Sequence, residues 1–219
     1  MPRLLFSKTG TAIWISHLDL MRLFQRSFKR AGLKLTHTQG FNPRPSVSIA
    51  LPLSVGVESF CELLDFQLEG ESVPTQTIRD LLNDTLVSGV EILDVYETGQ
   101  KIRDLAFLDC RITLEYDNGV PTDALAALSQ LFNRDSLFVV KKTKSGPKEQ
   151  DIIPMIQSVN MQKAGECAVW LDARICCQNP TLNPGQIIQA ICEQLPEMAP
   201  DFARIKRMEV YNKEHTVFR

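Results

Sequence analysis

The sequence lacks the cysteine spacings that hold metals. Its six cysteines, at positions 61, 110, 167, 176, 177 and 192, form no Cys-x-x-Cys pair and fit no zinc or iron–sulfur signature. Gly-x-Gly-x-x-Gly, P-loop and Gly-x-Ser-x-Gly motifs are missing as well. We therefore expect no metal site and no cofactor. We interpret the cysteines as free thiols that pack as small hydrophobic side chains, rather than as reactive or regulatory thiols.

Long hydrophobic runs are also missing. No stretch approaches the roughly 18–20 apolar residues needed to cross a bilayer, and the apolar run near Met1 is too short for a signal peptide. The last residues carry no lipidation motif. We expect a cytoplasmic protein that has no membrane partner.

Histidine is scarce, which limits the catalytic options. Of the three histidines, His215 lies in the C-terminal tail. His17 and His37 could form an acid–base pair for metal-independent RNA cleavage. Histidines more commonly cap, pack or contact a ligand, so we expect no catalytic activity and keep the ribonuclease hypothesis as an alternative.

The charge is unevenly distributed along the chain. The net charge is −2, but residues 1–50 contain eight Lys or Arg and a single acid, Asp19. The first 50 residues therefore carry +7 and the rest of the chain carries −9. Such a chain does not attract polyanions as a whole, but its N-terminal segment can bind them locally.

Two successive halves show the same order of elements, strand–helix–strand–strand–helix–strand. The first half contains them at residues 3–8, 16–31, 33–37 with 46–51, 61–68, 75–86 and 90–96. The second half contains them at residues 110–116, 122–132, 137–142, 167–176, 184–195 and 205–211. We predict an α+β protein with two tandem ferredoxin-like (βαββαβ) halves, residues 1–100 and 106–219.

Capping residues support two of these helices. Ser16 followed three residues later by Asp19 favours a helix start, and Gly32 is placed to end that helix in a left-handed conformation. Asn183 before Pro184, with Gln186 three residues after the asparagine, predicts a capping box at the last helix.

The first predicted helix is unusually basic. Its apolar residues recur at steps of three and four, as expected for a core-facing stripe: Met21, Phe24, Phe28 and Ala31. The cations Arg22, Arg26, Lys29 and Arg30 recur similarly on another face, with no acid among them. A solvated charged face is one interpretation; contact with a polyanion or an acidic partner is the other.

The segment that follows the helix is a stiff loop, residues 36–45. Two prolines bracket Arg44 and keep its backbone extended, and Gly40 permits a tight turn. Exposed aromatic, amide and guanidinium side chains on such a loop suit base stacking and phosphate contact: Gln39, Phe41, Asn42 and Arg44. The alternative is a structural turn in which Phe41 plugs the core.

A second basic segment lies at residues 141–148. Lys142, Lys144 and Lys148 could form a hairpin that extends a binding surface, although the acids that follow are also consistent with an ordinary exposed hairpin. With these lysines, the predicted RNA- or partner-binding set is completed by two residues from the N-terminal region, Lys8 and His17.

Several sequence motifs together resemble one bacterial family. They are Phe6-Ser-Lys-x-Gly10, Ser16-His-Leu-Asp-Leu20, Arg30-Ala-Gly32, Gly40-Phe-Asn-Pro-Arg-Pro45, Leu53-x-x-Gly56-x-Glu-Ser59 and Lys142-x-x-x-Gly146-x-Lys148-x-x-Asp151-Ile-x-Pro154. The chain resembles the bacterial radical-SAM-linked protein family, whose members are fused to or encoded beside B12-binding radical SAM proteins. One residue departs from the expected pattern, because Ile153 stands where an arginine would precede Pro154.

The resemblance implies an uncharacterised domain that works with a radical SAM partner. The chain lacks the three-cysteine motif of such enzymes, so we expect an accessory role. Our leading hypothesis is a non-catalytic module that binds structured RNA and presents it to that partner. The alternative to RNA binding is a docking module that contacts only the radical SAM protein. At the level of fold, tandem ferredoxin-like halves are also similar to Cas6-type RNA-binding proteins, but the C-terminal glycine-rich loop of those proteins is missing here.

Overall fold

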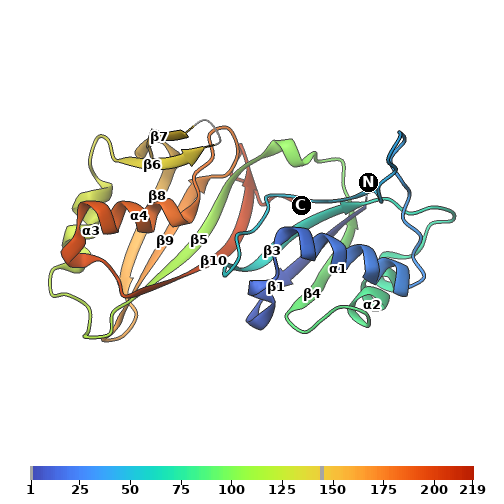
Figure 1. The fold of residues 1–219 in the computed structure, drawn as a ribbon, viewed down its shortest axis with the longest axis horizontal. Helices are drawn as coiled ribbons and strands as arrows, with labels where there is room; N and C mark the ends of the chain where they lie inside the picture. The colour runs from blue at the N-terminus through green and yellow to red at the C-terminus, as the bar shows by residue number, and fades with distance from the viewer. Residues whose placement is uncertain (1, 144–145) are drawn as a thin grey trace. The chain divides into compact units, whose positions relative to one another are not determined.

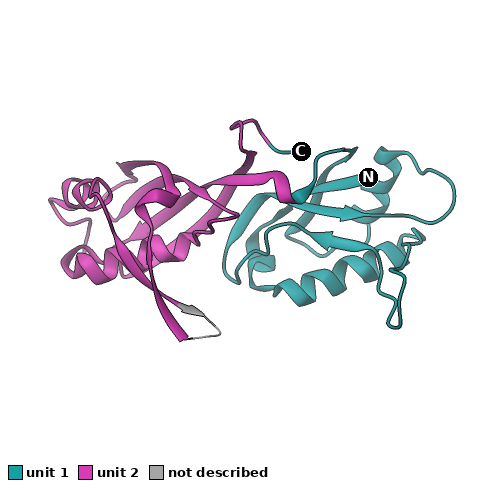
Figure 2. Cartoon of the chain, turned by 90° about the horizontal axis from the view of Figure 1, so that it is seen from above, with its two compact units in different colours: residues 1–102, 218–219 teal, residues 103–217 magenta. Residues whose placement is uncertain are grey.

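The computed structural model describes residues 2–143 and 146–219 and shows a mixed α+β protein. Within each unit of the chain the strands pair in an antiparallel manner, and four α-helices accompany the strands of the described residues. Figure 2 shows the two compact units in different colours: residues 1–102 with 218–219 are unit 1, and residues 103–217 are unit 2. In the part of the chain that is described, no helix is long and apolar enough to cross a membrane.

The described residues of unit 1 form four strands and two α-helices, and Figure 1 shows how α1 and α2 lie against the strands. Their order is β1 (Pro2–Lys8), α1 (His17–Arg30), β2 (Val47–Ile49), β3 (Glu58–Phe66), α2 (Thr75–Asn83) and β4 (Val90–Glu97). The strands lie in the order β4-β1-β3-β2, so β1 and β3 are central. A short 3-10 helix, η1 (Gly10–Trp14), connects β1 to α1.

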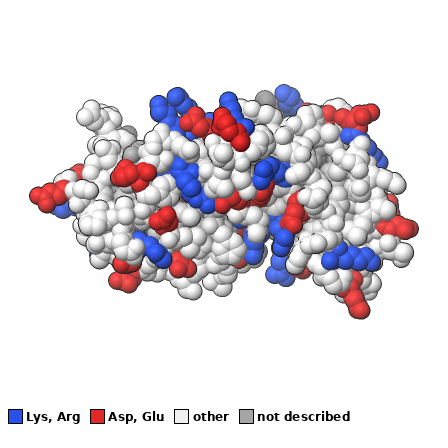
Figure 3. All heavy atoms as spheres, turned by 180° about the vertical axis from the view of Figure 1, so that it is seen from behind, with Lys and Arg blue, Asp and Glu red and all other residues white. Residues whose placement is uncertain are grey.

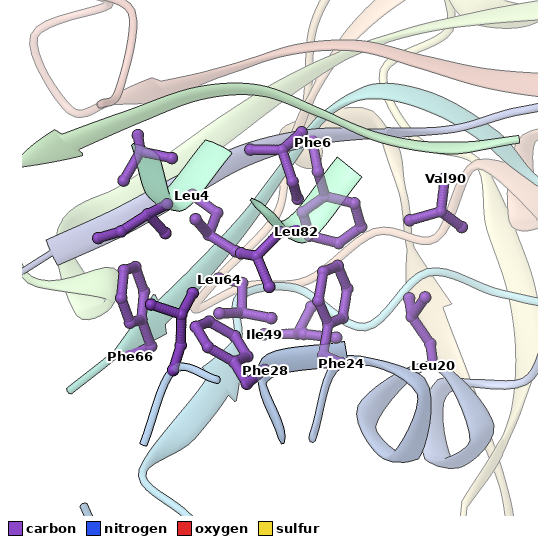
Figure 4. Close-up of a cluster of buried hydrophobic side chains, with 14 of the residues drawn as sticks. Leu4, Phe6, Leu20, Phe24, Phe28, Ile49, Leu64, Phe66, Leu82 and Val90 are labelled. Carbon is purple, nitrogen blue, oxygen red and sulfur yellow. The ribbon is translucent and has the colours of Figure 1, made fainter. Parts of the chain in front are cut away.

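The core of unit 1 lies between its strands and its helices. Leu20, Phe24 and Phe28 of α1 are buried against β1 and β3 side chains, as Figure 4 shows. The rings of Phe24 and Phe6 meet edge to face, with centroids 4.8 Å apart. This packing fixes the rotation of α1 about its axis, and the basic residues of the helix therefore face away from the core.

Polar side chains on β1 and β3 join the core of unit 1 to the end of the chain. Arg3 is fully buried and forms a two-pronged ion pair with Asp65. Its guanidinium also donates to the Gln100 carbonyl (2.9 Å) and lies 4.9 Å from the centre of the Phe218 ring. Phe218 and Arg219 thus belong to unit 1, whereas the sequence-based division placed them in the second half.

The described residues of unit 2 form six strands and two α-helices. Their order is β5 (Leu105–Glu115), α3 (Ala124–Phe132), β6 (Phe138–Thr143), β7 (Gly146–Asp151), β8 (Ile156–Lys163), β9 (Ala168–Cys176), α4 (Pro184–Gln194) and β10 (Phe202–Asn212). Four strands lie in the order β10-β5-β9-β8, while β6 and β7 form a separate hairpin. Three further 3-10 helices are η2 (Ile102–Asp104), η3 (Ile153–Met155) and η4 (Pro196–Met198).

The second half departs from the predicted element order at one place. The strand expected at residues 137–142 exists as β6, but it pairs with β7 and not with the four-stranded sheet. In its place β8, a strand that was not predicted, pairs with β9 at the edge of the sheet. Every residue of β8 is at least partly exposed, so the strand lacks the apolar alternation that reveals a half-buried strand.

The predicted helix caps are present. Ser16 is the N-cap of α1, and its hydroxyl accepts a hydrogen bond from the Asp19 N–H (3.2 Å). At the other end, Gly32 has φ +74°, its N–H donates to Lys29 O (3.2 Å), and Leu33 N–H donates to Phe28 O (2.9 Å). These two bonds form a Schellman motif. The capping box of Asn183 and Gln186 at α4 is confirmed as well.

Candidate nucleic-acid interface

The basic face of α1, formed by Arg22, Arg26, Lys29 and Arg30, is exposed. Arg22 is partly neutralised, because its Nη1 lies 2.9 Å from the Asp19 carboxylate. The Ser16 hydroxyl and Arg22 lower the pKa of Asp19, so this acid stays ionised. Arg30 donates to the Thr85 carbonyl (3.3 Å). Within the described residues, the side chains of Arg26 and Lys29 form no ion pair, so these two cations are available to a ligand.

The predicted binding loop projects from unit 1 (Figures 1 and 2). Its base is closed by a Thr38 N–H bond to Arg44 O (2.8 Å) and an Arg44 N–H bond to the Thr38 hydroxyl (3.1 Å). His37 and Pro45 form a β-bridge directly below. The side chains proposed for binding, Gln39, Phe41, Asn42 and Arg44, are all exposed.

Phe41 is 101% exposed, so the alternative in which it plugs the core is wrong. An aromatic ring that is fully accessible on a loop with a hydrogen-bonded base can stack on a nucleobase without a large rearrangement.

A pocket of about 520 Å³ lies where α1 ends and the loop begins. Leu33, Leu35 and Pro45 supply apolar surface, while Lys29 and Lys34 supply two cations. We call it the α1 pocket. It adds Lys34 to the candidate contacts, a residue that the sequence pattern does not single out because it lies between the helix and the loop.

Comparisons with known proteins place the chain in a family. The sequence profile of the family described as "Uncharacterized protein conserved in bacteria (DUF2344)" matches residues 2–198. The chain belongs to the DUF2344 family. A search of the curated proteins found no match for this DUF2344 chain.

The search of solved structures matched chains of two Cbf5 complexes. A chain of a Cbf5–Nop10–Gar1 complex matches with a TM-score of 0.54 and 7% identity, covering 95% of the DUF2344 chain and 48% of its own. A chain of an archaeal box H/ACA sRNP Nop10–Cbf5 complex matches with a TM-score of 0.44 and 8% identity, covering 94% and 46%. The DUF2344 chain thus spans about half the length of these chains. The first match shows similarity of fold alone.

Lys8 was predicted to contact RNA or a partner, and this prediction is wrong. In the DUF2344 chain it is 1% exposed, on a central strand, and its ammonium donates to the Ile13 carbonyl (3.0 Å). Burial lowers the pKa of Lys8, while the nearby Glu62 carboxylate acts in the opposite direction. Lys8 therefore supports the turn before α1 and is not at the surface.

The two histidines of the ribonuclease alternative, His17 and His37, are not brought together by the fold. His17 is the first residue of α1 and His37 follows its last turn, so a helix of 14 residues, roughly 20 Å long, separates them. Backbone hydrogen bonds near the two histidines are consistent with this separation. Next to His37, the Thr36 N–H donates to the carbonyl of Gln67, which follows β3. Before α1, the Thr9 N–H donates to the carbonyl of Gly89, which precedes β4. His17 Nδ1 is buried and has no hydrogen-bond partner among the described residues.

The second basic segment belongs to the β6–β7 hairpin of unit 2. Lys148 is exposed and pairs in register with Lys141 on the neighbouring strand. Lys142 pairs with Pro147 through the backbone, and Lys144 lies outside the described residues. Asp151, at the end of β7, accepts bonds from two backbone amides at the base of the hairpin, so this acid has a structural role.

The sheet of unit 2 carries a polar face that was not predicted. Three arginines each form a two-pronged ion pair across strands: Arg111 with Asp172, Arg174 with Asp109, and Arg204 with Glu115. Each also stacks on an aromatic ring, with distances to the ring centre of 4.3 Å to Trp170, 3.9 Å to Tyr211 and 5.5 Å to Phe202.

The ion pairs of this face keep its charge balanced. Seen from behind the view of Figure 1, positive and negative side chains are interspersed over the surface (Figure 3). Paired arginines whose guanidinium groups already contact carboxylates and rings are less available to phosphates than the cations of unit 1. We therefore interpret this face as a stabilising cross-strand ladder and place the candidate interface on unit 1. Within residues 2–143 and 146–219, no three His, Cys, Asp or Glu side chains come together as a metal site would require.

Proposed function

We propose that this chain is a non-catalytic binding module that holds structured RNA on unit 1 and presents it to a radical SAM partner. The observation that carries the RNA part is the fully exposed Phe41 at the tip of a loop beside cations that the fold leaves available. Arg26, Lys29 and Lys34 form no ion pair within the described residues. Phosphates bind such cations, and bases stack on such a ring.

The alternative is a docking surface for the partner protein alone. Aromatic residues and arginines are also enriched at protein interfaces, so Phe41 and Arg44 suit both ligands. The free cations along the side of α1 favour a linear array of phosphates, which needs charge along its length, over a protein patch with a central apolar anchor. The RNA proposal therefore rests on the surface of unit 1 and not on the similarity of fold to a Cbf5 complex.

The partner in this proposal comes from the resemblance of the motifs around Ser16, Gly40 and Gly56 to the radical-SAM-linked family. The sequence has no three-cysteine motif of the kind that ligates an iron–sulfur cluster, and four of its six cysteines are buried. The reaction on the RNA is therefore assigned to the partner, and this chain supplies binding and orientation.

We further propose that both units are ferredoxin-like. The orders β4-β1-β3-β2 and β10-β5-β9-β8 become the same arrangement when the β6–β7 hairpin is treated as an insertion after α3. In that comparison β8 corresponds to β2, and α4 corresponds to α2.

The RNA proposal is tested by binding to a structured RNA, such as bulk tRNA, over a salt series. Replacing Arg22, Arg26 and Arg30 with Gln should weaken binding and flatten the salt dependence by about 1 in the log–log slope for each phosphate that the variant no longer binds. The matched control removes three exposed cations of unit 2, Arg134, Lys163 and Lys213, and should leave the slope nearly unchanged.

The outcome can contradict the proposal in two ways. If the wild-type protein does not bind RNA at low salt, RNA is not its ligand. If both triple variants reduce the slope by the same amount, the binding is nonspecific and α1 is not the interface.

The loop is tested separately with Phe41→Ser. Without the Phe41 ring, one base loses its stacking partner, so binding should weaken about 5- to 150-fold, corresponding to about 1–3 kcal/mol. The control is Phe138→Ser, which changes a half-exposed phenylalanine of unit 2. Equal affinities for the Phe41 variant and the wild type would exclude stacking at this loop.

The partner is tested by co-purification from cell extract. A radical SAM protein should be retained, and nuclease treatment should release it if RNA connects the two. A complex that survives nuclease and is broken by the triple arginine variant would favour the docking alternative.

A further inference from the structure

The α1 pocket is formed entirely by unit 1, at a place that its backbone holds firmly. The Schellman motif ends α1 at Gly32 and directs the following residues back across the sheet. Leu35 then bridges to Leu68, and Glu69 N–H bonds to Lys34 O (2.8 Å). The pocket is therefore preformed, because hydrogen bonds fix the segments on both sides of it.

The floor of the pocket is apolar. Leu33 and Leu35 are both nearly buried in the core, so their surfaces toward the pocket cannot move away. Pro45 adds a rigid ring at the base of the loop. A volume of about 520 Å³ lies within the range of about 300–1,000 Å³ typical of small-molecule sites.

The rim of the pocket is polar and carries side chains that can form hydrogen bonds. It is lined by the amide of Gln25 and by Lys29, Lys34 and His37, and these last three form no ion pair within the described residues. Glu69 is the one acid among the described residues that line the pocket. Two ammonium groups thus outweigh one carboxylate, and the pocket has a net positive charge near neutral pH.

We propose that the α1 pocket binds one unpaired nucleotide of the RNA. This inference rests on the proposed function and specifies which part of the RNA unit 1 recognises. A nucleotide matches both parts of the pocket: its base is a flat, largely apolar ring for the leucine and proline floor, and its phosphate is an anion for Lys29 and Lys34. Glu69 can accept a hydrogen bond from an exocyclic amino group or a ribose hydroxyl.

The position of the pocket explains why an unpaired nucleotide is required. Bases inside a duplex are stacked and paired, so their rings cannot reach a concave floor unless they are extruded. The loop that carries Phe41 rises from the edge of the same pocket through Pro45. A nucleotide in the pocket therefore brings the neighbouring base toward the Phe41 ring, and the two contacts support each other.

The test compares two RNAs that share one stem. One contains a single bulged nucleotide, and the other is fully paired. Fluorescence anisotropy at fixed salt should show that the wild-type protein prefers the bulged RNA about tenfold, the gain expected from burying and stacking one base. Lys29→Gln combined with Lys34→Gln should bring the two affinities close together.

A matched double variant provides the control. Arg22→Gln with Arg26→Gln also removes two charges, both from α1, but changes no residue that lines the pocket. This variant should weaken binding of both RNAs equally and keep the tenfold preference. Because all four residues are exposed, none of these changes should unfold the protein.

The results separate this inference from the function on which it rests. Equal binding of both RNAs by the wild type, or a preference that persists in the lysine variant, would overturn the pocket while leaving RNA binding in place. Failure to bind either RNA would overturn both. As a direct check, uridine 5′-monophosphate should shift the NMR signals of His37 at concentrations at which inorganic phosphate does not; equal shifts would show that only a phosphate is bound.

Discussion

Replacing Phe218 with alanine tests whether the last residues of the chain hold unit 1 together. Phe218 is 0% exposed and its ring stacks against the buried Arg3 guanidinium. Truncating a fully buried phenylalanine typically costs about 3–5 kcal/mol, because apolar burial is lost and a cavity remains. We expect a value in the upper part of this range, since Arg3 is also deprived of a cation–π interaction in a desolvated place, worth about 1–2 kcal/mol.

Native-state hydrogen exchange followed by mass spectrometry can assign this loss to unit 1. Amides of β1 and β3 should exchange roughly 900- to 5,000-fold faster, the equivalent of about 4–5 kcal/mol. The control is Phe41→Ala, the same substitution in the same unit at a fully exposed ring, which should change stability by less than about 0.5 kcal/mol. If Phe218→Ala accelerates exchange in β1 and β3 less than tenfold, the ring does not hold unit 1 together.

Three further predictions concern individual residues. A thiol reagent should modify Cys167 and Cys192 in the native protein and the four buried cysteines only after denaturation, and rapid native reaction of all six would contradict the burial. Burial raises the pKa of Tyr96 to about 12, so its phenol should stay neutral in the folded state up to high pH. The free energy of unfolding should therefore fall as the pH rises from about 10 toward 12. In a tyrosinate absorbance titration, Tyr96→Phe should remove the component that titrates near pH 12, and an unchanged titration curve would refute this. Gly89→Ala should destabilise by at least about 2 kcal/mol in urea unfolding, because the added Cβ would overlap the Thr9 carbonyl oxygen at φ +87°, whereas Gly99→Ala, in open space, should be nearly neutral.

The parts of the fold that local signals define were predictable. Ser16 and Gly32 mark the ends of α1 because a capping side chain and a left-handed glycine act within a few residues, and the same holds for Asn183 at α4. The strand β8 was not predictable, since an edge strand with polar, partly exposed side chains has no hydrophobic period. Strand β7, with Pro147 and three charged residues, resembles a loop for the same reason.

The candidate site was predictable only in part. The exposure of Arg26 and Phe41 agrees with what a charged helix face and a proline-rich loop suggest. Lys8 could not be placed correctly, because the sequence does not reveal that β1 is a central strand. The cross-strand pair of Arg111 and Asp172 was also out of reach, since the residues are 61 positions apart and their meeting depends on the strand register.

The position of Phe218 in unit 1 also determines when this unit can be completed during synthesis. A ribosome produces all of residues 103–217, and hence every segment of unit 2, before it adds Phe218. Domains begin to fold as they emerge. The N-terminal unit is made first, but until Phe218 is added the Arg3 guanidinium lacks its contact with the Phe218 ring. Synthesis of unit 1 therefore begins before that of unit 2, but its last residues are added after unit 2 is complete.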